Sequence, residues 1–194
     1  MRLIAITGGI GSGKSVVSRM VEVMGFHVYD CDSRAKALMV QDKEVKQQLV
    51  EAFGQETYFA DGSINRIYLS NVAFADDASR ARLNGIVHPA TALDIKRWAE
   101  EQRNNGAHVA FVETALLRTG GLDRLVDEVW HVTAPVEVRI QRVISRNGLT
   151  ASQVKSRMAS QAAEENVADG EKVLINDGDT PLLSQVMQLL NQAN

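Results

Sequence analysis

Near its N-terminus the chain reads Leu3-Ile4-Ala5-Ile6-Thr7, followed directly by Gly8-Gly9-Ile10-Gly11-Ser12-Gly13-Lys14-Ser15. This stretch fits the phosphate-binding pattern G-x-x-x-x-G-K-S/T, which requires a strand before the loop and a helix after it. Glycines let the backbone curl so that its N–H groups face phosphate oxygens, and the following helix adds the positive end of its dipole. The stretch therefore predicts a binding site for a nucleoside triphosphate.

The two polar residues that end the loop have distinct expected tasks. Lys14 is expected to reach the β and γ phosphates, and Ser15 to bind Mg²⁺. The alternative is a glycine-rich turn that binds nothing. It requires the preceding strand and the Lys-Ser pair at the correct offset to coincide by chance.

Length and composition favour one core domain spanning residues 1–194, because the chain has 194 residues and 45% apolar content. Charge is nearly balanced, with 21 basic and 24 acidic residues and no long basic run, so we expect no nucleic-acid partner and no membrane surface. The apolar run after Arg2 is too short for a signal peptide or a membrane span. The single cysteine, Cys31, is expected to be a buried filler. We expect a cytoplasmic protein, with a monomer favoured.

Short β-rich runs alternate with helical patterns along the chain. The expected strands are residues 2–7, 26–30, 108–112, 128–133 and 172–176. Such alternation predicts an α/β fold in three layers, with a five-stranded parallel sheet covered by helices on both faces. Helices are expected to begin after the phosphate loop, at 14–24, and to follow the later strands at 135–147, 150–164 and 181–192.

Between the second and third expected strands lies a long segment without a strand pattern. We interpret residues 43–104 as a helical insertion that binds the acceptor substrate, since the segment is too long for a plain crossover. Its expected helices are residues 43–53, 66–75, 78–87 and 90–103. The third of these is expected to stop before Pro89.

Two carboxylates and an arginine follow the second strand, in Asp30-Cys31-Asp32-Ser33-Arg34. A carboxylate beside a transferring phosphate can accept the proton of an acceptor hydroxyl, and an arginine can pair with a phosphate. Asp32 is the better candidate for the base. The alternative is that Asp30 and Asp32 cap a helix over residues 33–39.

A third acid, Glu113, follows the third strand. An acid in this position is typical of a carboxylate that holds magnesium through water in phosphate-loop proteins. A solvated acid at a strand end is the equally simple alternative. The sequence leaves the two open.

Residues 136–165 are expected to form a short basic lid. Arg139, Arg142 and Arg146 share one helix face by spacing, and Lys155 and Arg157 follow. A lid of this kind closes over the triphosphate and stabilises charge on the transferred group. The alternative is a solvated face whose arginines pair with Glu137, Glu164 and Glu165.

Two further segments are suggestive only. His88 precedes a proline within the insertion, where a lone histidine is more often structural. Asn176-Asp177-Gly178 follows the fifth strand and permits close approach of backbone to a flat base.

Taken together, the chain resembles the dephospho-coenzyme A kinase family, which is similar to nucleoside monophosphate kinases. The resemblance spans almost the whole chain. It rests on Ile6–Ser15, on Asp30-Cys31-Asp32 with Arg34, on Leu83-Asn84 with Val87-His88-Pro89, and on Arg142, Arg146, Arg157, Gln161 and Asn176-Asp177-Gly178.

The resemblance implies transfer of the ATP γ-phosphate to the ribose 3′-hydroxyl of dephospho-CoA, with Mg²⁺, in the last step of coenzyme A synthesis. It implies catalytic roles for Asp32 as general base, for Lys14, and for Arg142 as the lid arginine. Acceptor-side positions are Asp32, Arg34 and His88. The implied ATP-binding residues are Gly8, Gly9, Gly11, Ser12, Gly13, Lys14, Ser15, Val16, Arg142 and Asn176.

The chain departs from the family at two places. Where the family usually has Asp-Val-Pro-Leu-Leu-Phe-Glu, residues 113–119 read Glu-Thr-Ala-Leu-Leu-Arg-Thr. The family's glutamine in the helix after Pro135 falls on Arg139, so Arg139 inherits no family role.

Three other functions compete with this one. The nearest is another small-molecule kinase of the same fold, acting on a nucleoside monophosphate or a sugar. A GTP-dependent switch is disfavoured because the chain has no N-K-x-D guanine motif and no D-x-x-G switch. A degenerate family member that only binds nucleotide is the third.

Overall fold

The computed structural model describes residues 1–193, which form two compact units. One unit combines Met1–Asp30 with the chain from Trp98 onward, and the other is Cys31–Arg97. The first unit contains the sheet, whereas the second is helical. The expected insertion, 43–104, overlaps most of the second unit. That this insertion binds the acceptor stays a prediction.

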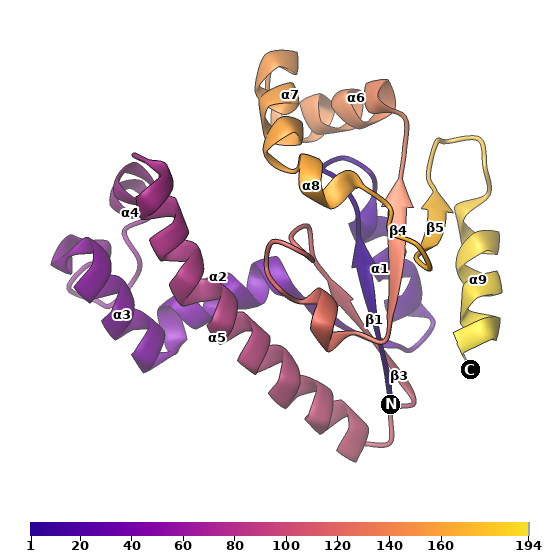
Figure 1. Ribbon diagram of the computed structural model, residues 1–194, viewed down its shortest axis with the longest axis horizontal. Coiled ribbons are helices and arrows are strands. Elements are labelled where there is room, and N and C mark those ends of the chain that lie inside the picture. The colour runs from indigo at the N-terminus through magenta and orange to yellow at the C-terminus, as the bar shows by residue number, and fades with distance from the viewer. Residues whose placement is uncertain (194) are drawn as a thin grey trace. The chain divides into compact units, whose positions relative to one another are not determined.

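The described chain contains one sheet of five parallel strands, in the order β2-β3-β1-β4-β5 (Figure 1). The strands are β1 (Arg2–Thr7), β2 (His27–Asp30), β3 (Val109–Glu113), β4 (Glu128–Thr133) and β5 (Lys172–Ile175). β1 lies at the centre and is buried over nearly its whole length, as its continuous apolar run requires in a sheet covered on both faces. The predicted fold class is confirmed.

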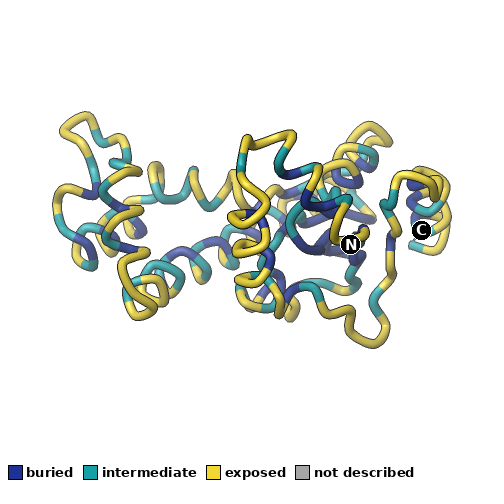
Figure 2. Tube along the Cα trace, turned by 90° about the horizontal axis from the view of Figure 1, so that it is seen from above, coloured by how far each residue is buried: buried dark blue, intermediate teal, exposed yellow. Residues whose placement is uncertain are grey.

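Two helices supply much of the core of the sheet unit. α1 (Lys14–Val23) and α9 (Leu182–Ala193) place their apolar stripes in one cluster with side chains of β1, β3, β4 and β5. At the centre of this cluster the rings of Phe111 and Trp130 meet edge to face, with centroids 5.1 Å apart. Figure 2 shows many of the buried residues, in dark blue, close to the N-terminus. The core of this unit is therefore formed by the strands together with α1 and α9.

The remaining helices lie close to the predicted positions. They are α2 (Cys31–Gln41), α3 (Lys43–Phe53), α4 (Arg66–Ala73), α5 (Asp77–Asn104), α6 (Val136–Asn147), α7 (Ala151–Ser160) and α8 (Ala162–Glu165), with short 3-10 turns at Gln55–Thr57 and Asp123–Leu125. Thr150 and Gln153 form the predicted capping box at the start of α7. The helix expected over 150–164 is interrupted at Gln161, which separates α7 from α8.

The helical unit has its own small core. α3 and α4 contribute the buried side chains Val45, Leu49, Phe53, Leu69 and Ala73. Asp42 caps α3 by accepting the N–H groups of Glu44 and Val45 at 2.9 and 3.0 Å. This unit therefore has apolar packing and helix caps of its own.

The expected helix break at Pro89 is wrong, because α5 continues through Pro89 as one helix. Proline lacks the N–H that would bond to the Gly85 carbonyl, and its ring crowds the preceding turn. Val87 before Pro89 and Thr91 after it are both buried. Their packing holds the helix together on both sides of the proline. Thr91 Oγ1 also donates to the Val87 carbonyl at 2.9 Å.

Among residues 1–193, no helix combines the length and the apolarity needed to cross a bilayer.

Replacing Pro89 with Ala should stabilise the protein, because alanine restores the N–H that can bond to Gly85. Proline costs a helix interior about 3 kcal/mol relative to alanine, and its stiffening of the unfolded chain offsets about 1 kcal/mol. We expect the free energy of unfolding to rise by about 1 to 2 kcal/mol in urea denaturation. Pro181→Ala, just before α9, is the control and should change it little. A lower stability of Pro89→Ala would show that α5 depends on the proline.

Candidate active site

The phosphate loop has the predicted order of strand, turn and helix, and its glycines have conformations that other residues rarely adopt. Gly8, Gly11 and Gly13 have φ of 139°, 78° and 102°. A Cβ on Gly8 would lie 2.1 Å from the Val132 carbonyl oxygen, and one on Gly13 would lie 2.0 Å from Asn176 Nδ2. These glycines are therefore required for the turn itself. They also let β4 and the segment after β5 approach the loop closely.

Lys14 begins α1 and folds its side chain over the loop. Its ammonium donates to the carbonyl oxygens of Gly8 and Gly9 at 2.8 and 3.4 Å. Ser15 and Val16 follow in the exposed first turn of α1. The helix N-terminus and the Lys14 charge therefore converge on the turn, which suits an anionic ligand.

The neighbouring strands β2 and β3 bring two acids to the same sheet edge. Asp30 ends β2 and is in register with Glu113, which ends β3 and is in turn in register with Ile6 of β1. Helix α2 begins at Cys31, two residues before the expected start, so Asp30 directly precedes it and Asp32 lies within its first turn. A carboxylate in the first turn is favourably placed for the helix dipole.

Asn176 connects three segments on the opposite side of the loop. Its Nδ2 donates to the Ser12 carbonyl at 2.8 Å, and its backbone N–H donates to the Thr133 carbonyl at 2.8 Å. Arg142 of α6 donates to the Asn176 carbonyl and side-chain oxygens at 2.9 and 3.4 Å. The structure thus brings Arg142 and Asn176, both predicted at the ATP site, into direct contact with each other.

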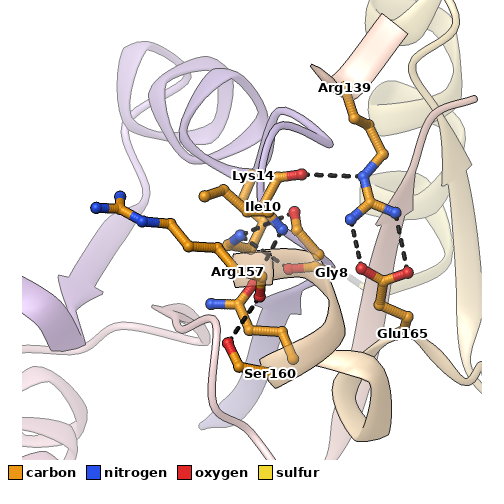
Figure 3. Close-up of polar contacts among 9 residues, drawn as sticks. Gly8, Ile10, Lys14, Arg139, Arg157, Ser160 and Glu165 are labelled. Atoms are coloured by element: carbon orange, nitrogen blue, oxygen red, sulfur yellow. Dashed lines mark hydrogen bonds and ion pairs between the residues drawn. The ribbon is translucent and has the colours of Figure 1, made fainter. Parts of the chain in front are cut away.

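Arg139 is not part of a solvated face. It is buried, its Nε donates to the Ile10 carbonyl at 2.9 Å, and its guanidinium pairs with Glu165 (Figure 3). Gln161 Oε1 accepts the Ile10 N–H at 3.1 Å. The alternative that α6 presents a solvated row of arginines is therefore wrong for Arg139, although it did name Glu165 among the partners.

The other basic residues of the lid are more exposed. Arg146 donates to Asn147 Oδ1 at 3.0 Å near the end of α6. In α7 the Arg157 carbonyl accepts the Ser160 hydroxyl at 2.8 Å, and the Arg157 side chain extends away from Arg139 in Figure 3. The arginines of α6 therefore differ in their surroundings despite sharing a helix face by spacing.

The segment that departs from the family pattern is held by carboxylates from elsewhere in the chain. The backbone N–H groups of Arg118 and Thr119 donate to the buried Glu164 at 3.0 and 2.7 Å. The Arg118 guanidinium pairs with Glu171, whose other oxygen lies 3.2 Å from His131 Nδ1. The contacts of Glu171 and His131 were not predicted from the sequence, because no local pattern joins residues so far apart in the chain.

Burial lowers the pKa of the His131 imidazole. The nearby Glu171 carboxylate opposes this effect, while the positive charges of Arg118 and Lys14 reinforce it. A lowered pKa favours the neutral imidazole at neutral pH. This polar cluster thus combines one arginine, one carboxylate and one buried imidazole.

In the helical unit, Arg34 of α2 is joined to α5. Its Nε and Nη2 donate to one oxygen of Asp94 at 3.0 and 2.7 Å. His88 lies half-buried in α5, before Pro89. Asp94 also lines a cavity of about 210 Å³ between α2, α3 and α5. Asp94 was not predicted, since an acid on a helix of mixed polarity carries no distinguishing pattern.

Similar proteins of known identity match nearly the whole chain. A family model described as dephospho-CoA kinase matches residues 2–181. The dephospho-CoA kinase of Geobacter sulfurreducens is 39% identical over 179 residues, which cover 92% of this chain and 91% of that protein. The dephospho-CoA kinase of Bacteroides fragilis is 35% identical over 188 residues, covering 96% and 90%.

Solved structures agree in fold. A Thermus thermophilus protein superposes with a TM-score of 0.80 at 27% identity, covering 98% of this chain and 96% of its own. A dephospho-CoA kinase from Campylobacter jejuni gives a TM-score of 0.73 at 19% identity, covering 99% and 97%. At this identity the second likeness concerns the fold alone.

The lowered pKa of His131 predicts a pH dependence of stability. The unfolded chain takes up a proton near the ordinary histidine pKa of about 6.5, whereas the folded chain does so only at lower pH. The unfolded state therefore binds more protons as the pH falls below about 6.5, so the free energy of unfolding decreases there. We expect His131→Gln to lose less stability than the unaltered protein between about pH 7.5 and 5.5 in urea denaturation.

His27→Gln, which removes an exposed imidazole, is the control for this measurement. It should keep the pH dependence of the unaltered protein. Equal loss of stability on acidification in the unaltered protein and in His131→Gln would contradict the prediction.

Proposed function

The chain belongs to the dephospho-CoA kinase family, and we propose how its residues transfer the ATP γ-phosphate to the ribose 3′-hydroxyl of dephospho-CoA. This kinase reaction is the last step of coenzyme A biosynthesis. The phosphate loop gives the strongest support for our assignment of the donor site. Its glycines, Lys14 and the N-terminus of α1 converge on one turn.

On the donor side, we assign the triphosphate to the loop from Gly8 to Ser15, continuing to Val16. Backbone N–H groups and the Lys14 ammonium neutralise phosphate charge. Arg142 and Asn176 hold the nucleotide on the lid side, an assignment supported by their mutual hydrogen bonds and by the bond from Asn176 to Ser12. Held in this way, Arg142 stabilises charge on the transferred group without reorganisation during the reaction.

On the acceptor side, we assign Asp32, Arg34 and His88 to dephospho-CoA. Asp30 ends β2, and Asp32 lies two residues further along the chain. Arg34 is oriented by Asp94, and a guanidinium oriented in this way suits a phosphate of the acceptor. The helical residues 43–104 form the acceptor-binding part of one kinase domain, and residues 136–165 form its lid.

Magnesium fits the donor side of this arrangement. Mg²⁺ usually binds through one or two protein ligands together with substrate phosphates and waters, so it does not require a cluster of acidic ligands. The Ser15 hydroxyl in the exposed first turn of α1 would hold it, with Glu113 at the end of β3 acting through water. When bound, the ion offsets negative charge on the phosphates.

The proposed reaction is an in-line displacement. The Asp32 carboxylate accepts the proton of the 3′-hydroxyl as that oxygen bonds to the γ-phosphorus, and the bond from phosphorus to the β,γ-bridging oxygen breaks to release ADP. Lys14 and Arg142 stabilise the charge on the phosphoryl oxygens. We further propose that the protein works as a monomer in the cytoplasm. The buried position of Cys31, the lone cysteine, is compatible with a reducing compartment.

Asp32→Asn tests the base assignment. It should lower kcat by more than tenfold, since general bases typically contribute at least that much. ATP affinity should stay nearly unchanged because Asp32 is assigned to the acceptor. Asp77→Asn is a matched control, because Asp77 is also an acid in the first turn of a helix. It should leave kcat unaltered. An unchanged kcat in Asp32→Asn would remove the base assignment.

A comparison of acceptors tests the substrate assignment against the nearest alternative, a kinase for nucleoside monophosphates or sugars. ADP release should be fast with dephospho-CoA and at least tenfold slower with each common nucleoside monophosphate, because a site with oriented polar groups strongly rejects a ligand that leaves them unpaired. A coupled assay for ADP measures both. Preference for a monophosphate would overturn the acceptor assignment.

A further inference from the structure

Arg139 of α6 holds the phosphate loop at Ile10. Its Nε donates to the Ile10 carbonyl at 2.9 Å. The described chain contains no cis peptide bond, and a planar trans peptide directs its C=O and the next N–H to opposite sides. The Arg139 bond therefore fixes the direction of the Gly11 N–H, which points away from the Arg139 Nε.

The preceding peptide is fixed in the same way by another residue of the lid. The Ile10 N–H donates to Gln161 at 3.1 Å, so the Gly9 carbonyl points away from the lid. That carbonyl accepts the Ser12 N–H at 3.2 Å and lies 3.4 Å from the Lys14 ammonium. The lid thus holds both polar groups of Ile10 on the outside of the loop.

The Arg139 side chain is itself held rigidly. It is only 6% exposed, and its two terminal nitrogens pair with the two oxygens of Glu165 (Figure 3). Gly9 leaves the space for it, since a Cβ on Gly9 would lie 2.3 Å from Arg139 Nη2. A bidentate pair of this kind has one geometry, and breaking it leaves a buried charge without a partner.

We propose that Arg139 is a positioning residue for the nucleotide, which aims the Gly11 N–H at the phosphates by holding the Ile10 carbonyl outward. Glu165 fixes Arg139, and Gln161 holds the adjacent peptide. The ligand affected is a diphosphate or triphosphate, because a phosphate loop of this kind cradles the β- and γ-phosphates. This inference rests on the proposed donor site at the phosphate loop.

Nucleotide affinities of Arg139→Met test this role. Methionine keeps an apolar stem of similar length but cannot donate to Ile10 or pair with Glu165. We expect the Kd for ADP to rise about tenfold, the effect of losing one hydrogen bond to a charged group. The Kd for AMP should change less than about twofold, because AMP lacks the β-phosphate. Isothermal titration calorimetry measures both dissociation constants.

Arg2→Met is the matched control. Arg2 pairs with Glu128 at 2.5 Å at the start of β1, the opposite end of that strand from the phosphate loop. Removing this pair should lower the unfolding temperature without changing the ratio of the ADP and AMP affinities. The control separates a general loss of stability from the selective loss that positioning requires.

Gly9→Ala disturbs the position of Arg139 by a change in the phosphate loop. The new methyl group would displace the Arg139 guanidinium, so this variant should also lose affinity selectively for ADP. Combined with Arg139→Met, it should add little further loss, since the displaced group is already absent. Should Arg139→Met fail to fold, Gly9→Ala and Glu165→Gln decide the question by the same selective loss.

Equal losses for ADP and AMP, or an unchanged ADP affinity in the folded variants, would overturn the positioning role. Additive effects of Gly9→Ala and Arg139→Met would overturn it as well. Failure of the unaltered protein to bind ADP would instead refute the donor site. The two proposals are therefore tested separately.

Discussion

The donor side of this protein depends on the tight turn by which β1 passes into α1. β1 lies at the centre of the sheet, so this turn opens at the middle of the carboxyl edge. Three segments approach it closely, from β4 at Gly8, from α6 at Gly11 and from the end of β5 at Gly13, where a Cβ would lie 2.6 Å or less from a neighbouring atom. The absence of side chains at these positions therefore sets the shape of the turn and also admits the lid and Asn176.

The fold could be predicted in large part because its signals are local. The buried strands read as continuous apolar runs, and the glycine pattern with Lys14 identified the phosphate loop without any long-range information. The break at Pro89 was predicted wrongly for the same reason. A local preference was applied where packing of α5 on both sides of the proline outweighs it.

The candidate site was only partly predictable, because its chain-specific contacts join residues far apart in sequence. Arg139 and Glu165 lie 26 positions apart, and the Arg118 N–H and its acceptor Glu164 lie 46 apart. In both cases a carboxylate of α8 receives donors from a different element. The Arg139–Glu165 ion pair itself adds little net stability, but breaking it would leave the buried Arg139 charge without its partner. The segment at residues 113–119, which departs from the family pattern, is thus anchored near its end by Glu164 and Glu171.

These anchors constrain how the lid can move. α6 and α7 share the buried side chains Ile140, Val143, Val154 and Met158, against which Ile10 also packs. Moving the two helices together would break the bonds of Ile10 to Arg139 and Gln161 and that of Arg142 to Asn176. If these bonds are kept, only exposed side chains of α7, such as those of Lys155 and Arg157, are left to move. The buried Arg139 is therefore a fixed part of the nucleotide site. Lys155 and Arg157 of α7 are the basic residues that can approach the phosphates by moving.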